Sequence, residues 1–342
     1  MAKEQTDTKN DDTTDPGTVE SCGSFVGAGS TGRVELVHGQ KRVRKVVNPA
    51  LKGHSVYLVD EMRREIEIYE HLPRDSRRTL RMLHWFDHDN DAGIELEYMA
   101  NGTLREYLAK HSADVVDGVP TIPARLRARW ALEATDGIAL LHQHEVIHAD
   151  IQPGNMLIDT QFGLRIIDLS GSGFRGKMNF GLESARYCMA HEPGDSTARR
   201  STVANETTDL FALGSTLYHI VTGARPYDTL TDEEVEARYF RLEFPSLGDI
   251  DTGNGGVDSP LMFADAIRRC WHAEFASATD VLGALKTETL ARFDDDDLAY
   301  IETSSAIMLR PQVCRQDTVN TDGPTGNAIV PHRLPLPNGH LV

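Results

Sequence analysis

The stretch IHADIQPGNMLID, residues 147–159, places three polar side chains at fixed intervals between apolar pairs. Asp150 follows His148 by two positions, Asn155 follows Asp150 by five, and a Pro-Gly pair between them favours a loop. A carboxylate in such a loop can orient an attacking hydroxyl group or accept its proton, and an amide oxygen can bind a magnesium ion. The alternative is an ordinary polar turn before a hairpin, with His148 packed as a structural residue.

A second carboxylate, Asp168, ends the apolar stretch LRII and leads into a segment rich in Gly and Ser, 18 residues beyond Asp150. The end of a buried strand is a common place for a metal ligand. It is equally a common place for a side chain that caps a turn. Taken alone, Asp168 supports either interpretation.

A Gly-rich stretch, GAGSTGRV at residues 27–34, precedes Lys45 on the next predicted strand. A strand follows these glycines, which argues against a dinucleotide-binding fold and favours a loop that covers phosphates. Alternation puts Lys45 on a strand face with valines, where it needs a negative partner, and Glu65 on the following predicted helix can supply one. A plain hairpin and a solvated basic strand are the alternatives.

The hydrophobic periodicity changes once along the chain. Residues 22–99 contain alternating stretches that predict strands around one helix, at about residues 60–72, and helices dominate from residue 103 onwards. The expected fold class is therefore α+β, with a small β-rich part followed by a larger helical part.

The two ends of the chain and its charge limit where the protein acts. Residues 1–20 and 296–342 are polar, and we expect both to be mostly disordered, although residues 298–310 could dock as a short element. A net charge of −17 argues against nucleic acid as a partner, and no apolar run is long enough to span a membrane. Four scattered cysteines and an N-terminus without a signal sequence favour an intracellular protein, cytoplasmic or nuclear.

The order of these features resembles that of the eukaryotic protein kinase superfamily: Gly-rich loop, strand lysine, helix glutamate, H-x-D-x-x-x-x-N loop and a later aspartate. The resemblance extends through TTDLFALGSTLYHIVTGARPYDTL, which is similar to the central helix of the kinase large lobe, with Asp209 bracing the catalytic loop. It is greatest for the divergent Ser/Thr-type kinases of filamentous fungi. It implies a bilobal kinase domain at residues 21–292, with an N-lobe at about 21–99 and a C-lobe at about 103–292.

The resemblance also implies an activity and a set of residue roles. The chain would transfer the γ-phosphoryl group of ATP, with Mg2+, to Ser or Thr hydroxyl groups of a protein substrate. Asp150 would be the catalytic base, and Lys45, steadied by Glu65, would hold the α- and β-phosphates. Asn155 and Asp168 would bind Mg2+. The residues that would bind ATP are Gly27, Ala28, Gly29, Ser30, Gly32, Val34, Val43, Lys45, Glu97, Met99 and Leu157.

Several positions depart from the kinase pattern. Ala149 replaces the arginine that usually pairs with an activation-loop phosphate, which implies that activation needs no such phosphate. Gln152 replaces the lysine that neutralises the transferring phosphoryl group, which implies slower catalysis. The usual Asp-Phe-Gly reads Asp-Leu-Ser, with Ser170 last, and Phe275 stands where an arginine would anchor the activation segment.

These departures leave two other hypotheses open. A pseudokinase would bind ATP or protein partners without efficient phosphotransfer. A small-molecule phosphotransferase shares the H-x-D-x-x-x-x-N loop and the later aspartate, but the Gly-rich loop and the long central helix argue against it. An active kinase is favoured because five polar catalytic positions keep the expected residues, and such groups are costly to leave partly buried and unpaired. These five are Lys45, Glu65, Asp150, Asn155 and Asp168.

Overall fold

The computed structural model describes residues 23–28, 32–37, 41–47, 55–88, 91–116, 119–177, 183–189, 203–248 and 261–310. The predicted ATP-binding residues Gly29 and Ser30 and the N-terminal tail expected at residues 1–20 lie outside these ranges. The chain divides into a compact unit that ends at Leu309 and a second unit from Arg310 to Val342. The fold and the site described below belong to the first unit.

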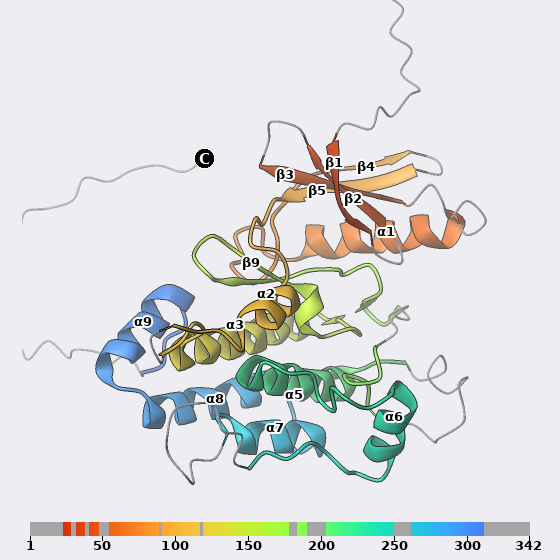
Figure 1. Cartoon of the computed structure of the whole chain (residues 1–342). Coiled ribbons are helices and arrows are strands. Elements are labelled where there is room, and N and C mark those ends of the chain that lie inside the picture. The colour runs from red at the N-terminus through yellow and green to blue at the C-terminus, as the bar shows by residue number, and fades with distance from the viewer. Residues whose placement is uncertain are drawn as a thin grey trace, which may run out of the picture. The chain divides into compact units, whose positions relative to one another are not determined.

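The N-lobe is built on a five-stranded antiparallel sheet in the order β1-β2-β3-β5-β4 (Figure 1). Its strands are β1 (Gly23–Ala28), β2 (Gly32–Val37), β3 (Arg42–Val47), β4 (Met82–His88) and β5 (Asp91–Glu97). The register pairs Lys45 of β3 with Val34 of β2 on one side and with Ile94 of β5 on the other. Lys45 therefore lies in the centre of the sheet, which excludes the alternative of a solvated basic edge strand.

Helix α1 (Ser55–His71) packs against one face of this sheet (Figure 1). The predicted helix is confirmed, and its apolar residues at helical spacing, Met62, Ile66, Tyr69 and Leu72, are all buried. Glu65 lies on the edge of the same stripe and is buried too. The helix period thus carries a carboxylate into the interface between helix and sheet.

The C-lobe is helical, as predicted, and two of its helices form the centre. Its helices are α2 (Leu104–His111), α3 (Ala124–Gln143), α5 (Glu206–Thr222), α6 (Asp232–Phe240), α7 (Ala264–Trp271), α8 (Ala278–Arg292) and α9 (Asp295–Ser305). Helices α3 and α5 are buried along most of their length, and α7, α8 and α9 pack around them (Figure 1). Within the described ranges, no helix combines the length and the apolar character of a membrane span.

Short strands carry the predicted site loops between these helices. Strands β9 (Met156–Ile158) and β10 (Leu164–Ile166) form the hairpin expected after the H-x-D-x-x-x-x-N loop, which itself contains the single-turn helix η2 (Pro153–Asn155). Strands β8 (Val146–Ile147) and β11 (Gly173–Phe174) pair with each other, and the loop that holds Asp168 lies between β10 and β11. A further small ladder joins β6 (Val115–Val116) and β7 (Val119–Pro120).

The packed part of the chain extends beyond the boundary predicted at residue 292. Residues from 296 were expected to form a mostly disordered tail, but α9 lies against α3 and buries Leu298 and Ile301. Arg78, which lies between α1 and β4, donates a hydrogen bond of 2.5 Å to the carbonyl oxygen of Ser305 at the end of α9. The segment 298–310, considered as a docking element, is therefore largely part of the domain, and residues from 311 lie outside the described ranges.

Candidate active site

Lys45 joins the two lobes through its ammonium group. Its Nζ donates to Glu65 Oε2 at 2.7 Å and to Asp168 Oδ1 at 2.9 Å. Burial opposes the charge of Lys45, but the carboxylates of Asp168 and Glu65 outweigh it and raise the pKa of the ammonium group. The structure therefore brings together a permanent cation on β3, a carboxylate on α1 and a carboxylate of the C-lobe.

Asp168 is held as a carboxylate by its neighbours. The ammonium of Lys45, together with a hydrogen bond from Ser170 Oγ at 2.9 Å, lowers the pKa of Asp168 to about 2. Its backbone lies in the left-handed region, with φ 64°. The Asp-Leu-Ser sequence thus creates a contact that was not predicted: the serine that replaces glycine holds the carboxylate of Asp168 through its hydroxyl group.

Asp150 and Asn155 lie in one loop, as predicted, and they are also hydrogen-bonded to each other. Asn155 Nδ2 donates to the backbone oxygen of Asp150 at 2.8 Å and to its Oδ2 at 2.7 Å. Both amide hydrogens are thereby used, which leaves the amide oxygen of Asn155 as the donor for a metal ion. Burial raises the pKa of Asp150, which is the direction that suits a carboxylate that accepts a proton.

Asp209 on α5 supports this loop from below. Its carboxylate accepts hydrogen bonds from the backbone N–H of His148 at 2.8 Å and of Ala149 at 2.9 Å, and it contacts His142 Nε2 at 2.9 Å. Ala149 is held in the left-handed region, with φ 63°. His148 is a structural residue here, because its Nε2 donates to the Ile167 carbonyl and its Nδ1 accepts from the N–H of Asp150.

The residues predicted to surround the nucleotide line the sheet and the facing hairpin. Val43 is buried, and Val34 and Leu157 are half-buried against the same core. An added Cβ at Gly32 would lie 3.0 Å from Lys45 Cγ, so glycine leaves room there for the lysine side chain. Gly27 and Ala28 lie in β1 beside β2.

Two of the predicted ATP contacts, Glu97 and Met99, lie at the end of β5 and just after it. The N–H of Glu97 donates to the carbonyl oxygen of Arg81, and the N–H of Tyr98 donates to that of Lys41. The N–H of Glu97 is therefore already used by a bond within the lobe. Met99, another predicted ATP contact, is half-buried against the core two residues further on.

Arg105 on α2 contacts the catalytic loop and was not predicted from the sequence. Its Nη2 donates to Gln152 Oε1, and Gln152 Nε2 donates to Asp150 Oδ1 at 2.7 Å. Helical spacing alone places Arg105 on a polar face of α2 and does not predict its contact with the loop. The one feature of the sequence that points to a close approach is Gly154, which has no Cβ.

Two residues of the activation segment were also missed. Burial raises the pKa of Glu183 to about 9, with Asp209 adding to the shift, and among the described residues Glu183 Oε1 has no hydrogen-bond partner. Arg186 forms an ion pair with Asp232 on α6 and donates to the carbonyl oxygen of Leu230. This ion pair anchors the segment at a place where the sequence showed no anchor.

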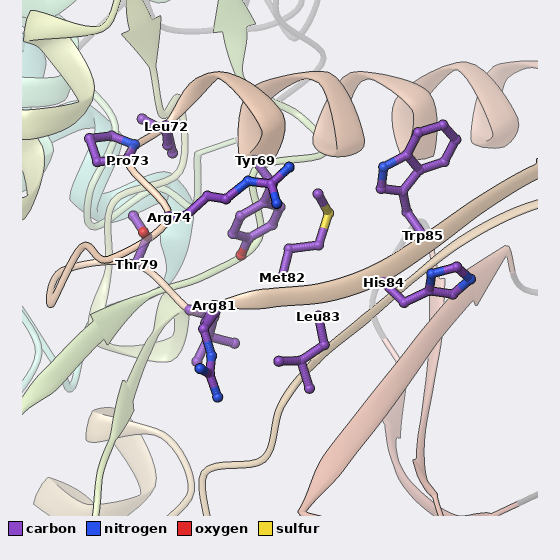
Figure 2. A pocket seen from close by; sticks show the side chains of 11 residues that line it. Tyr69, Leu72, Pro73, Arg74, Thr79, Arg81, Met82, Leu83, His84 and Trp85 are labelled. Carbon is purple, nitrogen blue, oxygen red and sulfur yellow. The ribbon is translucent and has the colours of Figure 1, made fainter.

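A cavity of about 180 Å³ lies in the N-lobe between the end of α1 and strand β4. Figure 2 shows the ring of Tyr69 and the side chain of Met82 inside it, with Trp85 turned towards α1. None of the predicted site residues lines this cavity. The predicted site residues lie elsewhere, around Lys45 and Asp150.

The comparisons with known proteins agree with this geometry. A family model described as the protein kinase domain matches residues 21–252. Mouse Aurora kinase C is 26% identical over 247 residues, which are 70% of this chain and 83% of that protein. Mouse Aurora kinase B is 26% identical over 221 residues, covering 64% of this chain and 59% of that protein.

A more distant relative adds a second name. A putative serine/threonine-protein kinase/receptor of Acanthamoeba polyphaga mimivirus is 24% identical over 188 residues, which are 53% of this chain and 11% of that protein. The family model covers most of the chain and includes both Lys45 and Asp168. The chain belongs to the protein kinase family.

Proposed function

We propose that the chain is a protein serine/threonine kinase that uses ATP and Mg2+. One observation carries the proposal: Lys45 Nζ contacts both Glu65, at 2.7 Å, and Asp168, at 2.9 Å. This ion-pair pattern aligns the two lobes in the way that phosphoryl transfer requires. The names of the relatives, Aurora kinases and a putative serine/threonine kinase, support Ser and Thr hydroxyl groups as acceptors.

The site residues divide the reaction between them. The substrate oxygen bonds to the γ-phosphorus as the bond to the β,γ-bridging oxygen breaks, ADP leaves, and the hydroxyl proton passes to Asp150. Lys45 would hold the phosphates that stay on ADP. The oxygen donors of Asn155 and Asp168 fit Mg2+, a hard cation that binds few protein ligands and would neutralise phosphate charge.

The second candidate is a pseudokinase, and the uncharged Gln152 beside Asp150 favours it. Gln152 donates a neutral hydrogen bond to Asp150 where a lysine would bring a full charge. A nucleotide could then bind without efficient transfer. A pseudokinase predicts binding of ATP without turnover, so one experiment separates the two functions.

The test is phosphate incorporation by the purified chain with ATP and Mg2+, into itself and into a generic acceptor protein, read by mass spectrometry. Asp150→Ala removes the base, and Asp265→Asn, an exposed carboxylate on α7, is the matched control. Incorporation on Ser or Thr that is lost in Asp150→Ala and kept in Asp265→Asn supports the kinase. Thermal stabilisation by ATP and Mg2+ without incorporation refutes it in favour of the pseudokinase.

A further inference from the structure

Gln152 lies between a cation and the predicted base. Its Oε1 accepts a hydrogen bond from Arg105 Nη2, and its Nε2 donates at 2.7 Å to Asp150 Oδ1. An arginine has only donors, and a carboxylate has only acceptors. The amide of Gln152 is therefore fixed in one orientation by chemistry on both sides, and the three residues form a polarised chain from α2 to the catalytic loop.

The loop is shaped to admit the guanidinium group. An added Cβ at Gly154 would lie 2.5 Å from Arg105 Nη2 and 2.7 Å from Arg105 Cζ. Any side chain at this position would push the end of Arg105 away. Glycine at 154 thus lets the guanidinium group lie directly over the turn that carries Asp150 and Asn155.

Helix α2 is hydrogen-bonded to the same hairpin, so the backbone position from which the Arg105 side chain extends is fixed as well. Thr103 caps α2 in a capping box with Glu106, and it bridges to Leu157 of β9. The N–H of Ile158 donates to the carbonyl oxygen of Gly102 at 3.0 Å. Arg105 projects from the first turn of α2, two residues after this anchored point.

We propose that Arg105 is a positioning residue for phosphoryl transfer, which supplies through Gln152 the positive charge that this catalytic loop lacks. This inference rests on the proposed kinase function. The guanidinium group keeps its charge at any pH, and it directs the amide hydrogen of Gln152 towards Asp150. The proposed base is thereby held in one orientation although no lysine follows it.

The exposure of Arg105 separates this role from a structural one. Arg105 is exposed on its helix, and an exposed arginine adds little to the stability of a fold. Its loss should therefore appear in turnover and not in unfolding. A residue that only packs α2 would show the opposite pattern.

The experiment compares kcat, KM for ATP and Tm for the full chain, Arg105→Gln and Lys110→Gln. Lys110 is an exposed cation in the last turn of the same helix and serves as the control. Arg105→Gln is expected to lower kcat about ten-fold, the size of one charge-assisted hydrogen bond, with KM and Tm unchanged. Lys110→Gln is expected to behave as the parent.

A rescue makes the test specific for charge. Adding Gln152→Lys to Arg105→Gln brings a cation back to the loop and is expected to restore most of the lost kcat. In the parent, Gln152→Lys places two cations side by side and is expected to give no gain. Gly154→Ala displaces the guanidinium group and is expected to lower kcat in the same direction as Arg105→Gln.

Two results would overturn the inference while the proposed kinase stands. In the first, an active parent keeps its kcat in Arg105→Gln. In the second, kcat falls together with Tm and Gln152→Lys does not restore it. An inactive parent would instead remove the proposed function, and the role of Arg105 with it.

Discussion

Replacing Asp209 by asparagine tests whether this one carboxylate shapes the catalytic loop. Asp209 is fully buried and accepts two backbone hydrogen bonds, one on each carboxylate oxygen, from His148 and Ala149. An asparagine of the same shape has one oxygen and one NH2 group. One of the two backbone N–H groups would then face another donor inside the protein.

The expected cost follows from that single mismatch. An unsatisfied buried donor costs about 1–3 kcal/mol, and exchanging a charged acceptor for a neutral one weakens the remaining bond. We therefore expect Asp209→Asn to lower the free energy of unfolding by about 3 kcal/mol. Because Ala149 is held at φ 63° directly before Asp150, we also expect kcat to fall when its N–H is released.

Urea unfolding measures the first effect, and phosphate incorporation under conditions where the variant stays folded measures the second. The exposed carboxylate of Asp265 again provides the control, because Asp265→Asn removes a surface ion pair and should leave unfolding unchanged within error. An Asp209→Asn variant that unfolds at the parental urea concentration and keeps the parental kcat would refute the role assigned to Asp209.

Two further predictions concern buried charge. Lys45→Met leaves the buried carboxylate of Glu65 without its cation, so we expect the free energy of unfolding in urea to fall by about 3–5 kcal/mol. Adding Glu65→Leu should restore most of this loss, and a double variant no more stable than the single one would contradict this. Burial lowers the pKa of His219 from 6.5 to about 4. As the pH falls, the unfolded chain therefore binds a proton at this residue before the folded chain does, and the free energy of unfolding decreases between pH 6.5 and pH 4. His219→Gln should show less of this loss, by about 3 kcal/mol, when unfolding is followed across that window, and an equal pH dependence in both proteins would contradict the assignment.

Much of the candidate site could be predicted from local patterns in the sequence. The spacing of Asp150 and Asn155 is short enough for one loop to join them, and the structure confirms a direct contact. Alternation placed Lys45 on an inner strand face, and helix period placed Glu65 beside the buried stripe of α1, where the two meet at 2.7 Å. These interactions were predictable because strand and helix periods decide which side chains face the core.

Other features depend on which surfaces meet. Phe275, expected to leave the activation segment without an anchor, is buried under the guanidinium of Arg269, at 3.9 Å from the ring centre. The anchor is instead the pair of Arg186 and Asp232, and neither residue belongs to a pattern that periodicity can detect. The sequence of helix α9 likewise predicts part of a polar tail, but its few apolar residues pack against α3.

The sequence by itself therefore determined the lobes, the hairpin loops and which polar side chain each element offers to the candidate site, because all of these follow from spacing within one element or one turn. Only the tertiary structure decided which charged side chain lies beside the loop that contains Asp150. Arg105 and Gln152 are 47 positions apart, and their contact requires α2 to dock on the hairpin and Gly154 to leave the space open. Such a contact is set by the packing of whole elements, which periodicity does not encode.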